Sequence, residues 1–133
     1  MLLCDFAEEV NGKLYIVGGG WSMRVVQPQA LMSVAIKLAV GWNEANERLN
    51  FTLRLVTEDG QPVDPGTGPI EITGTAVVGR PPQVTPGTDL DSAMAITLGL
   101  PLGVGAYRWE FTINGQPLAQ EPFVVTPPGG PRL

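Results

Sequence analysis

The sequence predicts an all-β fold, namely a two-sheet antiparallel β-sandwich of immunoglobulin-like or C2-like type with about eight strands and Greek-key crossovers. Three observations favour this fold. Apolar residues recur at every second position in several runs, turn-forming Asn-Gly and Asp-Gly pairs separate those runs, and helical spacing is almost absent from the 133 residues. The chain holds 17 Gly and 13 Pro, yet 44% of its residues are hydrophobic, a composition typical of a turn-rich folded domain rather than of disorder.

Two runs alternate strictly and predict strands with one buried face. In residues 49–55 every odd position is apolar and every even position is polar, and residues 107–113 repeat the pattern with Trp109 and Phe111 pointing inward. Weaker alternation predicts six more strands, with a ninth if 61–64 pairs briefly. The apolar residues that define the six are Leu2, Cys4 and Phe6; Leu14 and Ile16; Met32, Val34, Ile36, Leu38 and Val40; Ile70, Ile72, Ala76 and Val78; Met94, Ile96, Leu98 and Leu100; and Phe123 and Val125.

Three dipeptides predict tight hairpins, because Asn-Gly and Asp-Gly supply the positive φ values of a type I′ turn. They are Asn11-Gly12, Asp59-Gly60 and Asn114-Gly115. We therefore expect residues 2–10 to pair with 13–17, 48–58 with 61–64 or its extension, and 106–113 with 116–125.

Proline and glycine predict where regular strands stop. The segments 62–69 and 79–87 are rich in both, so we expect them to be loops that cross between the sheets. Pro122 lies inside the last strand and predicts an edge or a bulge there. Only 42–48 could form a helical turn, with Asn43 as a candidate N-cap. The length predicts a single domain over 1–126, followed by a flexible Pro/Gly-rich tail at 127–133.

Composition argues against several classes of function. The chain has no His and one Cys, so it lacks an imidazole base, the usual zinc ligands and an internal disulfide, and we expect Cys4 to be a buried small hydrophobe. The 13 acidic residues outnumber the 8 basic ones, without a basic cluster, which argues against nucleic acid or an anionic membrane as partner. No basic segment leads into an apolar run at the start, and no run is long enough to span a bilayer. We therefore expect a cytoplasmic protein.

The most distinctive local feature is Gly18-Gly19-Gly20-Trp21, directly after a predicted strand. Glycines let the backbone bend sharply or approach a ligand closely, and the tryptophan adds a large flat surface. Two interpretations remain open. The segment is a corner between the sheets with Trp21 closing the end of the core, or it is a binding corner. It lacks the spacing and the following helix of a phosphate-binding loop.

Two further patterns indicate weaker candidate sites. Trp21 and Trp42 lie at strand ends and could stack on a sugar if both were exposed together near Asn43 and Asn46. Acidic residues gather at 58–64 and at 89–91, where loops from one end of a sandwich could hold calcium. Solvated loop carboxylates and tryptophans that cap the sandwich are the simpler explanations, and no calcium-loop motif is present.

Several segments of the first half resemble a family of small bacterial proteins, mainly actinobacterial, known only as a domain of unknown function. The segments are Leu2-Leu3-Cys4-Asp5-Phe6-Ala7, Val10-Asn11-Gly12-Lys13-Leu14, Ile16-Val17-Gly18-Gly19-Gly20-Trp21, residues 42–45 and residues 55–63. The resemblance implies a β-sandwich of similar length. It implies no activity, cofactor or catalytic residue.

The sequence therefore favours a non-enzymatic protein-interaction or assembly module that needs no cofactor or metal and binds a protein partner or a second copy, as a dimer, through free edge strands. The alternative is a β-sandwich that binds a small ligand, or a carbohydrate with calcium. The candidate binding residues are Gly18, Gly19, Gly20, Trp21, Trp42 and Asn46.

Overall fold

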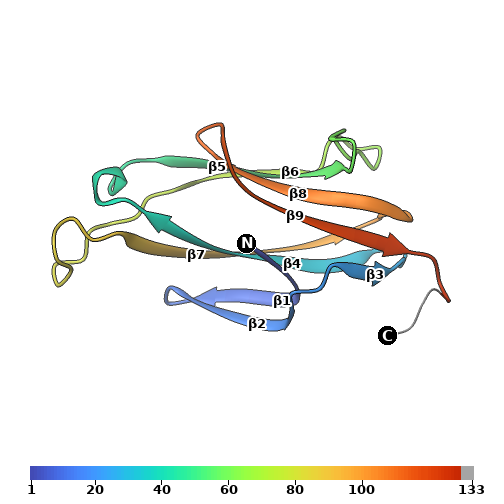
Figure 1. Ribbon diagram of the computed structural model, residues 1–133, viewed down its shortest axis with the longest axis horizontal. Coiled ribbons are helices and arrows are strands. Elements are labelled where there is room, and N and C mark those ends of the chain that lie inside the picture. The colour runs from blue at the N-terminus through green and yellow to red at the C-terminus, as the bar shows by residue number, and fades with distance from the viewer. Residues whose placement is uncertain (130–133) are drawn as a thin grey trace.

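The computed structural model describes residues 1–129 and arranges their nine strands in two facing sheets (Figure 1). One sheet has the order β2-β1-β4-β7 and the other β3-β9-β8-β5-β6, and all pairs are antiparallel except β3 with β9. This confirms the predicted two-sheet antiparallel sandwich. The predicted tail at 127–133 is described only as far as Gly129, and 130–133 lie outside the described residues. The strands are β1 (Leu2–Val10), β2 (Lys13–Gly19), β3 (Met23–Val25), β4 (Ala30–Val40), β5 (Leu49–Thr57), β6 (Glu71–Ala76), β7 (Leu90–Leu100), β8 (Gly105–Ile113) and β9 (Gln116–Thr126).

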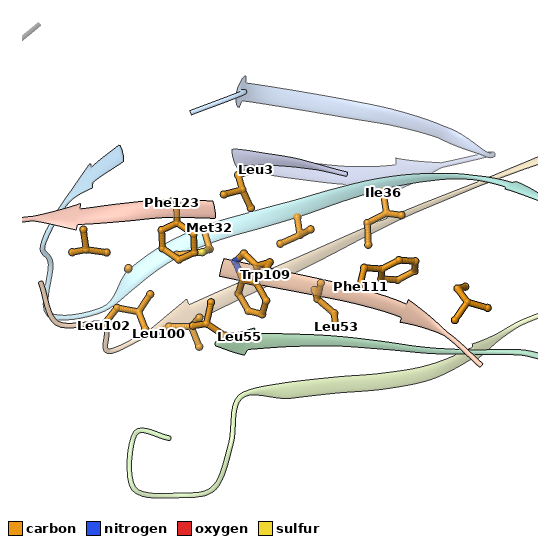
Figure 2. Packing of buried hydrophobic residues seen from close by; sticks show 14 of the residues in the cluster. Leu3, Met32, Ile36, Leu53, Leu55, Leu100, Leu102, Trp109, Phe111 and Phe123 are labelled. Carbon is orange, nitrogen blue, oxygen red and sulfur yellow. The ribbon is translucent and has the colours of Figure 1, made fainter. Parts of the chain in front are cut away.

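The main hydrophobic core lies between the sheets and is built by the alternating strands (Figure 2). Trp109 and Phe111 of β8 and Leu53 of β5 are fully or almost fully buried, opposite Met32 and Ile36 of β4. The alternation of 49–55 and 107–113 therefore predicted the core correctly. Trp109 dominates by size, and among residues 1–129 its buried Nε1–H finds no hydrogen-bond partner.

Two of the three predicted turns form as expected. Asn11 and Gly12 have φ values of 52° and 77°, and Asn114 and Gly115 have 49° and 79°, so both pairs close type I′ hairpins. At the third turn only Gly60 has a positive φ, and the predicted type I′ geometry is wrong.

The pairing predicted for 48–58 is confirmed only in part. Residues 61–64 pair briefly with the end of β5, through a bridge from Val56 to Pro62 and two flanking backbone hydrogen bonds. The continuous ladder on this side of β5 is with β6, which begins at Glu71. Segment 62–69 therefore joins neighbouring strands of one sheet and is not a crossing loop. Segment 79–87 joins β6 to β7, which belong to different sheets, so the crossing loop predicted there is confirmed. The ninth strand is β3, which the sequence did not predict.

The helical turn is shorter than predicted. It is a 3-10 helix, η1 (Trp42–Glu44), preceded by Gly41 with no side-chain cap, so Asn43 is not its N-cap. No helix within residues 1–129 is long and apolar enough to cross a membrane. Pro122 lies in a part of β9 that has no partner on its outer side within the described part of the chain, because β3 pairs only from Val124 onward. The register shift of β9 lies nearer the start of the strand.

The β1–β2 hairpin leaves the plane of its sheet and covers the outside of the sandwich (Figure 1). β1 pairs with β4 only from Leu2 to Cys4, and beyond that point the hairpin lies against the outer side of β4 and β7. Small side chains fill this second interface, which lets the layers approach closely. Its buried members are Cys4, Ala7 and Ala35, with Leu14 and Ala95 partly buried beside them.

Candidate functional site

The outer side of the β1–β2 hairpin exposes a group of apolar side chains. Phe6 lies opposite Val17, and Val10 lies opposite Lys13, so these side chains share one face of the hairpin, and Tyr15 shares it with them. Ala7 points the other way, toward Ala35 of β4, so the face that carries Phe6 points to solvent. We call Phe6, Val10, Tyr15 and Val17 the hairpin face.

The hairpin face is unusually apolar for a solvent-exposed strand pair. Its exposed fractions range from 41% at Val10 to 62% at Val17. β2 also exposes 40% of Ile16, so four consecutive apolar residues, from Leu14 to Val17, occupy a strand at the edge of a sheet. Contiguous exposed apolar groups of this kind mark interaction sites in soluble proteins.

Few charges interrupt the hairpin face. Glu8 lies opposite Tyr15, and Lys13 lies at the turn opposite Val10. The Glu9 carboxylate accepts a hydrogen bond from the Gly12 backbone N–H at 2.7 Å, which holds it at the turn. By the same register Glu8 lies between Phe6 and Val10 on this face, so the uncharged part of the face is the end that holds Phe6 and Val17.

The only cysteine lies beneath this hairpin and is chemically quiet. Cys4 is completely buried, and its Sγ lies 3.4 Å from the Ser33 carbonyl oxygen. Burial, reinforced by the neighbouring Asp5 carboxylate, raises the pKa of the thiol, so the thiol stays protonated at neutral pH. The predicted buried position is confirmed.

The glycines at 18–20 form a structural corner at the end of β2. Gly18 and Gly20 have φ values of 61° and 89°, which favour glycine, and a Cβ on Gly18 would collide with the Asp5 carboxylate. Gly19 pairs with Cys4, and the Gly20 N–H donates to the Leu3 carbonyl oxygen at 2.7 Å. The chain then passes into β3 of the other sheet, as the corner interpretation predicted.

Trp21 closes the core at this corner. Its ring meets Phe123 edge to face at a centroid distance of 5.9 Å, and the Arg24 guanidinium lies 4.7 Å from its ring centroid. Arg24 is held in turn by Asp5 at 3.2 Å and by the Leu31 carbonyl oxygen. One face of the indole ring is therefore already occupied by a side chain of the protein.

Trp42 and Asn46 lie at the other end of the sandwich. Trp42 is half-buried, and Arg80, which the sequence did not single out, covers its ring at 4.7 Å and donates two hydrogen bonds to its carbonyl oxygen. Asn46 has a φ of 63°, and its N–H donates to the Val78 carbonyl oxygen at 2.8 Å. Roughly 30 Å of β4 lies between this end and Trp21. The structure therefore does not join Trp21 and Trp42 into one stacking platform.

The two acidic loops also lie at opposite ends. Asp91 follows Leu90, which pairs with Val40 at the Trp42 end, whereas Glu58 follows the far end of β5. Asp64 instead accepts hydrogen bonds from the N–H groups of Gly66 and Gly68 in its own loop. Among residues 1–129 no three Cys, Asp or Glu side chains gather at metal-binding distance.

The sequence contained a signal for the hairpin face that the alternation analysis missed. Cys4 and Phe6 were grouped as one apolar face, yet Cys4 is buried and Phe6 is 46% exposed, because β1 leaves the sheet between them. A run of apolar residues on both faces of β2 is the pattern that could have indicated an exposed apolar surface.

Fold and site together define a two-sheet β-sandwich domain that carries an apolar hairpin on the outside of one sheet. The chain belongs to a family of unknown function, DUF6941, whose family model matches residues 1–126. The match agrees with the resemblance inferred from the sequence, since both indicate a family of unknown function. Comparison with curated proteins and with solved structures gives no match.

Proposed function

We propose that this domain is a non-enzymatic protein-interaction module of the bacterial cytoplasm and that the hairpin face is its docking surface. The observation that carries the proposal is the exposure of Phe6, Tyr15 and Val17 on one outward side of β1 and β2. Aromatic and aliphatic side chains of this kind supply most of the binding energy at protein interfaces.

The remaining chemistry of the chain supports a protein partner over other classes. The net charge of −5 disfavours nucleic acid and anionic membranes. The nucleophile that sequence reasoning considered, Cys4, is buried and protonated. The two tryptophans considered for sugar stacking are each covered by an arginine.

The finer fold type is also a proposal, and we favour the immunoglobulin-like over the C2-like arrangement. The strand orders correspond to the A-B-E and G-F-C-C′ orders of an immunoglobulin-like sandwich, if β4, β5, β8 and β9 take the places of B, C, F and G. Tyr107, near the start of β8, donates from its hydroxyl to the Gly103 carbonyl oxygen at 2.7 Å, as in a tyrosine corner.

The docking surface is tested by capture of partners from cells with three baits: the natural chain, Phe6→Lys and Val104→Lys. Phe6 and Val104 are similarly exposed, but Val104 lies in the segment before β8, away from the hairpin. We expect a protein that the natural chain and Val104→Lys retain and Phe6→Lys loses, with the same order of affinities when the purified partner is used.

Retention of the same proteins by all three baits would contradict the docking surface. So would the absence of any protein that binds the natural chain after purification. Folding of each bait is checked by its thermal unfolding curve, since exposed substitutions at either position change stability by no more than about 0.5 kcal/mol.

A further inference from the structure

We infer that the partner at this hairpin is a second copy of the chain, joined by antiparallel pairing of the two β2 strands about a two-fold axis at Ile16. The inference rests on the proposed function and names its partner. It stands on three features of β2: a free edge, the lack of protection on that edge, and a sequence that complements itself.

The free edge is the first feature. β2 pairs with β1 on one side and is the last strand of its sheet within the described residues. Its extended residues 13–17 span roughly 17 Å, before the left-handed Gly18 bends the chain. In Figure 1 β2 lies at the margin of the molecule, with β1 between it and β4. Its outward N–H and C=O groups are therefore placed to extend the sheet.

The lack of protection distinguishes β2 from the other edge strands. Proteins usually protect edges with short strands, charged residues or proline. β3 has only three residues, β6 begins with Glu71 directly after a Pro-rich segment, and β7 carries Asp91 and ends next to Pro101. β2 contains no proline, and Lys13, at its start, is its only charged residue.

Self-complementarity selects a second copy and the register. With Ile16 opposite the partner's Ile16, Tyr15 lies opposite the partner's Val17, and Lys13 lies next to the partner's uncharged glycines at the end of β2. No charge meets a like charge in this register, whereas parallel in-register strands would place two Lys13 side chains next to each other. A closed two-fold arrangement is also the commonest form of homo-oligomer.

The same register unites the apolar surfaces of the two copies. Phe6 already lies beside Val17 within one chain, and pairing adds the partner's Tyr15 to the same row. Ile16, 40% exposed in the single chain, meets its own copy on the opposite face. Pairing thus covers the free edge of β2, adds apolar neighbours to the side chains on both of its faces, and forms a continuous sheet through both hairpins.

The first test uses opposite charges at the two-fold axis. Sedimentation over about 1 μM to about 1 mM should show dimers of the natural chain and of the control Val104→Lys. Ile16→Lys and Ile16→Glu should each weaken self-association at least about tenfold, because like charges meet at the axis and apolar burial is lost. Mixing the two variants should restore dimers, since opposite charges then meet.

The second test remains valid if a charged variant fails to fold. Ile16→Cys places two thiols at the axis, where the Cα atoms of facing residues are about 4.5–5.5 Å apart, within reach of a disulfide. Mild oxidation should give a covalent dimer of Ile16→Cys and none of Val104→Cys, since Cys4 is buried in both.

Several outcomes would overturn this inference. The natural chain could remain monomeric at the highest concentration, or dimers could persist in both charged variants. Mixing Ile16→Lys with Ile16→Glu could fail to restore dimers, or the two cysteine variants could cross-link equally. The proposed function fails separately. Phe6 lies on β1 and not on the pairing edge. If the natural chain is monomeric but binds another protein that Phe6→Lys does not bind, self-pairing is rejected and the docking surface is retained.

Discussion

Replacement of Trp109 by alanine is expected to lower the free energy of unfolding by roughly 3–5 kcal/mol. The indole ring is completely buried between the sheets, and its loss leaves a cavity that neighbours from β4, β5 and β9 cannot fill without moving. Urea denaturation measures the change. The slope of the free energy of unfolding against urea concentration should stay the same if only the folded state is affected.

Two variants make this result specific. Tyr15→Ala removes an aromatic ring that is 54% exposed and should change the free energy of unfolding by less than about 0.5 kcal/mol. Trp109→Phe keeps a smaller aromatic ring in the core and removes the unpaired Nε1–H, so it should lower the free energy of unfolding less than Trp109→Ala does. Equal losses for Trp109→Ala and Tyr15→Ala would contradict the position of the core.

Replacement of Ala7 by glutamate is expected to lower the free energy of unfolding by about 3 kcal/mol or to detach the hairpin, because it places an unpaired carboxylate in a dry interface. Ala7 is 3% exposed and packs with Ala35 on the outer side of β4. The loss should shrink as the pH falls toward 4, since burial raises the pKa of the new carboxyl group and the protonated form is less costly to bury.

The matched control is Val10→Glu, on the same strand but on the hairpin face, where the new carboxylate remains in water. We expect nearly natural stability there. Hydrogen exchange in the Ala7 variant should show lost protection in β1 and β2 with protection kept in β5 and β8. Equal stability of the two variants would show that the hairpin does not pack through Ala7.

The parts of the fold that alternation predicted are those in which local sequence determines the outcome. Trp109 and Phe111 occupy the core because period-two spacing places them on one face, and Asn11-Gly12 and Asn114-Gly115 form hairpins because their φ preferences are local. The pairing of β5 was predicted only in part, because the local turn gives the brief bridge at Pro62, whereas the ladder that begins at Glu71 depends on contacts farther along the chain.

The candidate site was predicted less well for a related reason. Alternation shows which residues share a face, but it does not show what covers that face. Cys4 and Phe6 are two positions apart, so alternation places them on the same face of β1. Cys4 is buried and Phe6 is exposed because β1 leaves the sheet between them. Likewise Trp21 and Trp42 are both strand-end residues in the sequence, and only the length and direction of β4 place them at opposite ends.

The central claim is that the two sheets enclose Trp109 while the hairpin lies outside them with Phe6 and Tyr15 in water. Hydroxyl-radical footprinting of the dilute chain, read by mass spectrometry, tests both halves in one measurement. We expect rapid oxidation of Phe6 and Tyr15 and protection of Trp109 and Met32 until the protein unfolds. Oxidation of Trp109 and Met32 as fast as that of Tyr15, or protection of Phe6 and Tyr15 at high dilution, would contradict the account.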